Sequence, residues 1–145
     1  MLFDPDNKIM KLCAEGMNME AAGKPEEASI LFIRAWNESL TDNEKFTAAH
    51  YVARHQKCVA DKLKWDEVSL QFALKIKDDS IKRALPSLYL NIAKCYEDLD
   101  YICKAEDNYK LALLYADFLT YNGYGNMIRN SILNALNRCS RSKSK

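Results

Sequence analysis

The stretch YLNIAKCYEDLDYICKAEDNYKLA, from Tyr89 to Ala112, decides the fold. Its first half carries side chains three and four residues apart, which is the spacing of one helix face: Tyr89, Ile92, Ala93 and Tyr96. Its second half repeats that spacing with Ala105, Tyr109 and Ala112. The alanines leave room for two helix backbones to approach closely, and the tyrosines fill the space beside them. We therefore predict two amphipathic helices joined by a tight turn.

The composition of the whole chain favours the same kind of structure throughout. The 145 residues are 48% hydrophobic, with four Gly and three Pro, and no alternating apolar and polar run occurs. A chain of this length suits one domain with a core of its own. We predict an all-α fold in which residues 1–139 form a single helical domain.

Two further segments repeat the hairpin pattern. Residues 9–40 contain Gly16 in the small position of a first helix, a stop at Gly23, and Ala28, Phe32 and Ala35 in a second helix. Residues 45–78 follow a capping-box sequence at Thr41–Glu44 and are less regular. There we expect one helix to run to about Lys62 and its partner to begin at Trp65, with Val68, Phe72 and Ile76 inside. The third segment covers residues 86–118, with Pro86 inside or at the start of its first helix.

These three segments resemble the tetratricopeptide repeat (TPR), whose second helix carries Ala, an aromatic residue and Ala. The resemblance covers about residues 9–118, and it is strong in the third segment, good in the first and weak in the second. Aligning the second helices at Ala28, Val68 and Ala105 gives spacings of 40 and 37 residues, longer than the usual period of about 34 and similar to some small bacterial TPR proteins. The resemblance implies a TPR-like α-α superhelix, or solenoid, of about three helix pairs. We expect residues 125–139 to form a C-terminal capping helix, seven helices in all, and residues 140–145 to form a disordered basic tail.

The sequence offers no pattern of catalytic chemistry. It has no phosphate-binding glycine loop, no GxSxG, no HExxH and no dinucleotide fingerprint. His50 and His55 are five residues apart, which places them about 140° apart around a helix, so they do not converge on one metal ion. The five cysteines include no CxxC pair and are expected to be free thiols. We predict no enzyme activity, no cofactor and no metal site.

The TPR resemblance implies that the first helix of each pair lines a concave groove that takes a peptide or a partner helix. Carried over to this chain, the partner-binding groove consists of Met10, Met17, His50, Arg54, Lys57, Asn91, Lys94, Asn126, Arg129 and Asn130. The basic members could meet acidic side chains or a C-terminal carboxylate, and Asn91 could hold a ligand backbone. The expected function is protein–protein interaction, as a scaffold without catalysis.

Two alternatives stay open. One is a structural or regulatory TPR subunit that forms a homodimer or acts beside a separate catalytic protein. The other is an RNA-binding helical protein, which is disfavoured because the net charge is +1 and the aromatic residues occupy the predicted core. No stretch reaches the ~18 apolar residues of a membrane span, and the free cysteines suit a reducing compartment, so a cytoplasmic location is expected and no membrane contact.

Overall fold

The computed structural model describes residues 3–143, and within that range it is all-helical, with seven α-helices and no strand. The chain divides into two compact units, one ending at Asp78 and the other beginning at Asp79. Unit 1 contains α1 (Lys8–Ala21), α2 (Pro25–Glu38), α3 (Asp42–Arg54) and α4 (Val59–Ala73). Unit 2 contains α5 (Leu85–Asp98), α6 (Ile102–Tyr115) and α7 (Gly123–Lys143), with 3₁₀ helices η1 (Asp79–Arg83) and η2 (Ala116–Phe118). The all-α prediction and the number of α-helices are confirmed for residues 3–143.

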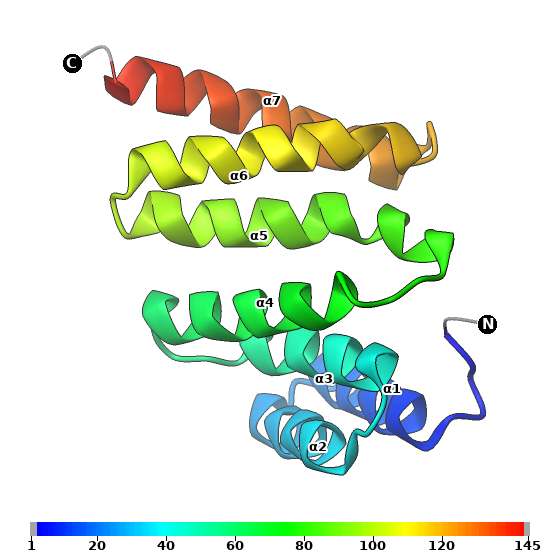
Figure 1. The fold of residues 1–145 in the computed structure, drawn as a ribbon. Coiled ribbons are helices and arrows are strands. Elements are labelled where there is room, and N and C mark those ends of the chain that lie inside the picture. Colours follow the sequence, from blue (N-terminus) through cyan, green and yellow to red (C-terminus); the bar gives the residue numbers. More distant parts are fainter. Residues whose placement is uncertain (1–2, 144–145) are drawn as a thin grey trace. The chain divides into compact units, whose positions relative to one another are not determined.

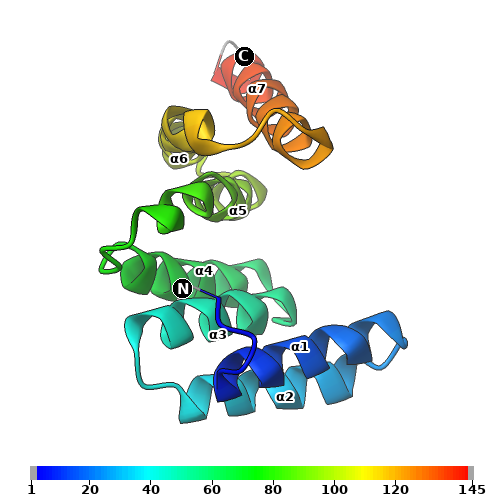
Figure 2. The same cartoon turned by 90° about the vertical axis from the view of Figure 1, so that its right-hand side faces the viewer.

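In unit 1, α1 and α2 form the first predicted hairpin (Figure 2). The side chain of Asn7 caps α1 by accepting hydrogen bonds from the amides of Ile9 and Met10. Gly23 adopts φ +74° between the helices, a conformation that favours glycine. Pro25 then begins α2. The predicted stop at Gly23 is therefore confirmed.

The contact between α1 and α2 depends on a missing side chain. Gly16 is buried, and a Cβ built on it would lie 2.3 Å from Cε1 of Phe32. The Phe32 ring is fully buried and stacks on Tyr51 at 5.0 Å and on His55 at 5.5 Å between centroids. Ala28 and Ala35 lie in the same core cluster. Close approach of two backbones is thus achieved here with Gly16, as the sequence pattern predicts.

The second hairpin differs from the prediction. The capping box of Thr41 and Glu44 is present, but α3 ends at Arg54 and α4 begins at Val59, so the expected helix to Lys62 and the start at Trp65 are wrong. No Gly or Pro marks this turn. It forms because His55 is held by tertiary contacts: its Nε2 lies 2.7 Å from the Glu20 carboxylate of α1, and its ring stacks on Phe32.

The inner face of α4 is also shifted from the expected one. Its buried residues are Asp66, Ser69 and Ala73, whereas Val68, Phe72 and Ile76 are only partly buried. The buried polar groups are satisfied, because Lys62 pairs with Asp66 at 2.8 Å and the Ser69 hydroxyl donates to the Phe46 carbonyl at 2.9 Å.

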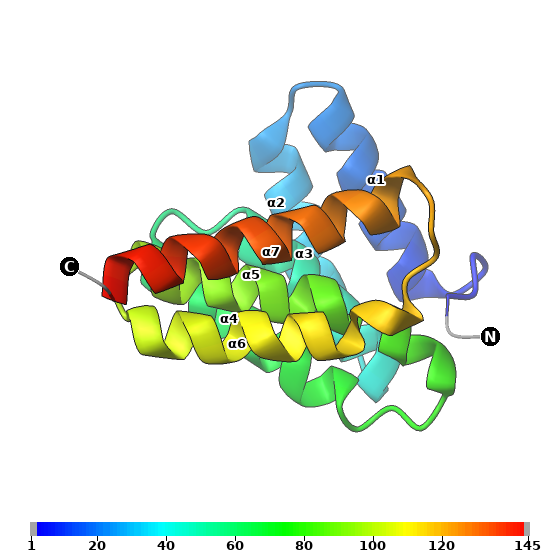
Figure 3. The ribbon, with the colours of Figure 1, turned by 90° about the horizontal axis from the view of Figure 1, so that it is seen from above.

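In unit 2, α5 and α6 form the third predicted hairpin and α7 lies along α6 (Figures 1 and 3). Pro86 occupies the first turn of α5, where its missing N–H costs nothing, so it marks the true start of the helix. Ala93, Ala105 and Tyr109 are buried in one core cluster with Ala135 and Cys139 of α7.

The basic C-terminal segment is helical rather than disordered. α7 continues to Lys143, which corrects the predicted end at residue 139 and the tail over 140–143, while residues 144–145 lie outside the described range. Arg138 pairs with Glu97 of α5, and Lys143 pairs with Glu106 of α6 at 2.9 Å. These ion pairs hold the last turns of α7 on its neighbours.

Candidate binding surfaces

Unit 2 contains a cleft of about 370 Å³ between α5 and α7. We name it the α5–α7 cleft, and its lining residues are Leu90, Asn91, Lys94, Tyr109, Ser131, Asn134 and Arg138. Two of them, Asn91 and Lys94, belong to the groove predicted from the sequence. Leu90 also belongs to α5, Tyr109 comes from α6, and the other three lining residues come from α7.

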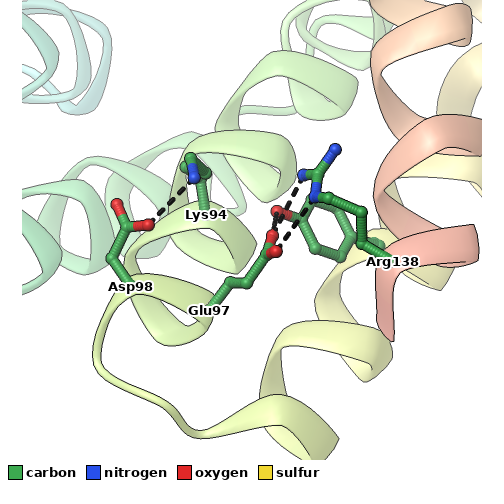
Figure 4. A network of polar contacts seen from close by, with 5 residues as sticks. Lys94, Glu97, Asp98 and Arg138 are labelled. Atoms are coloured by element: carbon green, nitrogen blue, oxygen red, sulfur yellow. Dashed lines mark hydrogen bonds and ion pairs between the residues drawn. The ribbon is translucent and has the colours of Figure 1, made fainter. Parts of the chain in front are cut away.

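A hydrogen-bonded network forms one side of this cleft (Figure 4). Glu97 accepts from Nε and Nη2 of Arg138 at 3.0 and 3.1 Å and from the Tyr109 hydroxyl at 2.6 Å. The bonds from Arg138 hold the pKa of the Glu97 carboxyl below its ordinary value, and the same ion pair raises the pKa of Arg138. Burial and the Glu97 carboxylate raise the pKa of Tyr109, so its hydroxyl stays protonated and remains a donor.

The positive charges of the cleft already have partners. Lys94 donates to Asp98 at 2.9 Å, one turn further along α5, and Arg138 is paired with Glu97. The side chains of Asn91, Ser131 and Asn134 form no hydrogen bond within residues 3–143. What the cleft offers to a ligand is therefore mainly neutral amide and hydroxyl groups, each able to donate and accept.

In unit 1 the predicted groove residues of α1 and α3 flank Tyr51. The Tyr51 hydroxyl donates to Sδ of Met17 at 3.3 Å, and the Arg54 guanidinium lies 5.4 Å from the Tyr51 ring. Arg54 also pairs with Glu20 at 3.1 Å. Met17 is exposed and Met10 is half-buried, so this surface combines thioether, aromatic and paired polar groups.

His50, another member of the predicted groove, lies beside Tyr51. Its ring packs edge-on against Tyr51 at 5.1 Å, and its Nδ1 is buried with no hydrogen-bond partner among the described residues. Burial, together with the charges of Arg54 and Lys62, lowers the pKa of His50 to about 4. His50 is consequently neutral near pH 7 and cannot serve as a cation for an acidic ligand.

The remaining predicted residues divide by environment. Lys57 is exposed in the turn between α3 and α4 and not on a groove-lining helix. Asn126 and Asn130 are exposed on α7. Arg129 is not a free cation, because its guanidinium donates to the carbonyl oxygens of Ala116, Leu119 and Thr120 and to Asn126. A single wall containing all ten predicted residues stays a prediction.

Sequence reasoning missed Arg138, Ser131 and Asn134. Arg138 could not be found from a local pattern, because its partner Glu97 is 41 residues earlier in the chain. A signal for α7 was present, because Asn126, Asn130 and Asn134 recur every four residues and therefore lie along one side of a helix.

Comparisons of the chain with protein-family models, curated proteins and solved structures find no match. Among the described residues, no group of three or more His, Cys, Asp or Glu side chains is arranged to hold a metal ion. Within residues 3–143, no helix combines the length and the apolar character needed to cross a membrane.

Proposed function

We propose that this chain is a TPR-like interaction module that binds an extended peptide or a partner helix in a groove, without a catalytic step or a cofactor. The observation that carries the proposal is the α5–α7 cleft, whose unpaired groups are neutral amides and a hydroxyl. The hairpins support the TPR-like architecture, because Gly16 with Phe32 and Ala93 with Ala105 use small residues in equivalent places. Five free cysteines suit a protein of the reducing cytoplasm.

The chemistry of the cleft favours recognition of a main chain. Asn91 on α5 and Asn134 on α7 each present an amide that can donate to a peptide C=O and accept from a peptide N–H. An acidic side chain or a C-terminal carboxylate of the partner would have to share Lys94 with Asp98 or use the remaining N–H groups of Arg138. Main-chain contacts therefore come first in this proposal, and a carboxylate adds to them.

The test begins with affinity capture on the full chain and continues with calorimetry on a synthetic segment of the captured protein. Asn91→Ala and Asn134→Ala should each weaken binding, because each removes about 0.5–1.5 kcal/mol of hydrogen bonding, or roughly two- to tenfold in Kd. Asn137→Ala is the matched control, since Asn137 is exposed on α7 and does not line the cleft. Equal affinity for the wild type and the Asn91→Ala, Asn134→Ala double variant would contradict the assignment of this cleft.

A further inference from the structure

One end of unit 2 carries exposed aromatic side chains that the helical pattern did not predict. Phe118, Tyr121 and Tyr124 are 44%, 82% and 55% exposed, although the aromatic residues were expected in the core. They lie at η2, in the following loop and at the start of α7, the end at which α5 begins and α6 finishes (Figure 1). The Tyr124 hydroxyl is 2.7 Å from the Ser87 hydroxyl in the first turn of α5. We name this surface the aromatic end, and its cations are Lys82, Arg83 and Arg129.

Tyr121 is held in place although it is largely exposed. The Arg129 guanidinium lies 4.1 Å from the centre of its ring and is itself fixed by hydrogen bonds to the carbonyl oxygens of Ala116, Leu119 and Thr120. The loop is also closely packed, because a Cβ on Gly125 would lie 1.9 Å from the Thr120 oxygen. One face of the ring thus rests on a rigid cation, and the other face is open to a flat ligand.

Beside it, η1 and η2 enclose a cleft of about 380 Å³ lined by Asp79, Ser80, Lys82, Arg83 and Phe118. The Lys82 ammonium lies 5.3 Å from the centre of the Phe118 ring and 3.3 Å from Asp79. Arg83 is exposed and forms no ion pair with any residue in the described range. The aromatic end therefore combines planar apolar surfaces with a cation that has no internal partner.

We propose that the aromatic end binds single-stranded nucleic acid. An unpaired base has two π-faces that stack on Tyr and Phe in any sequence, and the adjacent phosphate can accept from Arg83 or Lys82. A duplex fits less well, because its bases are already stacked and its recognition depends on many phosphate contacts. Asp79 and Asp117 oppose part of the positive charge here, so stacking supplies most of the affinity and the salt dependence is shallow.

The test uses the full chain and a short fluorescein-labelled oligouridine, with fluorescence anisotropy measured at several salt concentrations. We expect saturable binding with a log–log salt slope of about −1, the value for one or two phosphate contacts on a single strand. Tyr121→Ala should weaken binding about tenfold, Tyr121→Phe should retain it, and Arg83→Gln should weaken it and flatten the salt slope. Tyr121 and Arg83 are exposed, so circular dichroism should show that these variants fold normally.

Tyr101→Ala is the matched control. Tyr101 is 57% exposed and has the Lys104 ammonium 5.6 Å from its ring centre, but it precedes α6 at the opposite end of the hairpin. The proposal is overturned if oligouridine does not bind, if Tyr101→Ala costs as much as Tyr121→Ala, or if polyglutamate or duplex RNA binds as tightly as the single strand. Asn91→Ala should leave oligouridine binding unchanged, which separates this surface from the α5–α7 cleft.

Discussion

Replacing Gly16 by Ala tests the packing of the first hairpin directly. The new Cβ would lie 2.3, 2.6 and 2.8 Å from three carbons of the Phe32 ring. That ring cannot move aside easily, because it is fully buried and stacked on Tyr51 and His55. Overpacking of a core costs about 1–3 kcal/mol, and the better helix propensity of Ala offsets about 1 kcal/mol. With three contacts below 3 Å we take the upper end of the range, so unit 1 should lose about 2 kcal/mol of unfolding free energy.

Trp36 and Trp65 make the measurement specific to unit 1. They are the only two tryptophans of the chain, both lie in unit 1, and their rings meet edge-on at 5.1 Å. Urea unfolding followed by tryptophan fluorescence should therefore show a lower midpoint with an unchanged slope. Gly123→Ala is the control, because a Cβ there meets nothing within 4 Å. Adding Phe32→Leu to Gly16→Ala should cost less than the sum of the two single effects, since the smaller side chain removes the overlap.

A Gly16→Ala protein as stable as the wild type, or more stable, would refute this reasoning. It would mean that helix propensity alone acts at position 16 and that the Phe32 ring does not cover it. The interpretation that a small residue in the first helix accommodates a large residue of the second would then be unsupported in this hairpin.

Three further substitutions test other parts of the structure. Ala93→Trp should destabilise unit 2 by about 1–3 kcal/mol or more, measured by thermal unfolding with circular dichroism, because Ala93 is fully buried beside Ala105. Glu97→Gln should remove part of the loss of stability on acidification below about pH 4.5: the Glu97 pKa is lowered in the folded state, so its contribution is present above the unfolded-state value and is lost as pH falls. His50→Gln should reduce the loss of unit 1 stability between pH 6.5 and about 4, seen by tryptophan fluorescence. In that window His50 is neutral in the folded state and protonated in the unfolded state. This difference lowers the unfolding free energy by up to ~3 kcal/mol as the pH falls.

The local signals of the sequence predicted much of the fold, because they act within a few residues. The capping box at Thr41, the left-handed glycine at Gly23 and the small residues Ala93 and Ala105 all occupy the expected places. The turn between α3 and α4 could not be predicted in this way. It depends on a contact between His55 and Glu20, 35 residues apart, and it contains no residue with a strong turn preference.

The same limit explains the shifted face of α4. A hydrophobic pattern assigns Asp66 and Ser69 to the surface, because buried polar side chains are costly unless they are hydrogen-bonded. Here Lys62, one turn earlier on α4, pairs with Asp66, and the Phe46 carbonyl of α3 accepts from Ser69. Only the folded hairpin brings Phe46 close to Ser69. The hydrophobic pattern therefore assigned the wrong inner face to α4, because Asp66 and Ser69 are buried together with hydrogen-bond partners.

For the candidate surfaces, the sequence located cations but not their partners. Arg54, Lys94 and Arg129 were grouped as a positive wall, yet each is bonded to a carboxylate or to carbonyl oxygens of its own unit. The exposed ion pairs of Arg54 and Lys94 contribute at most about 1 kcal/mol, but they neutralise charge that would attract an acidic ligand. Salt dependence therefore separates the two proposed surfaces physically. Binding in the α5–α7 cleft through Asn91 and Asn134 exchanges neutral hydrogen bonds and should change little with salt. Binding at the aromatic end places a phosphate beside Arg83 and should weaken as salt rises.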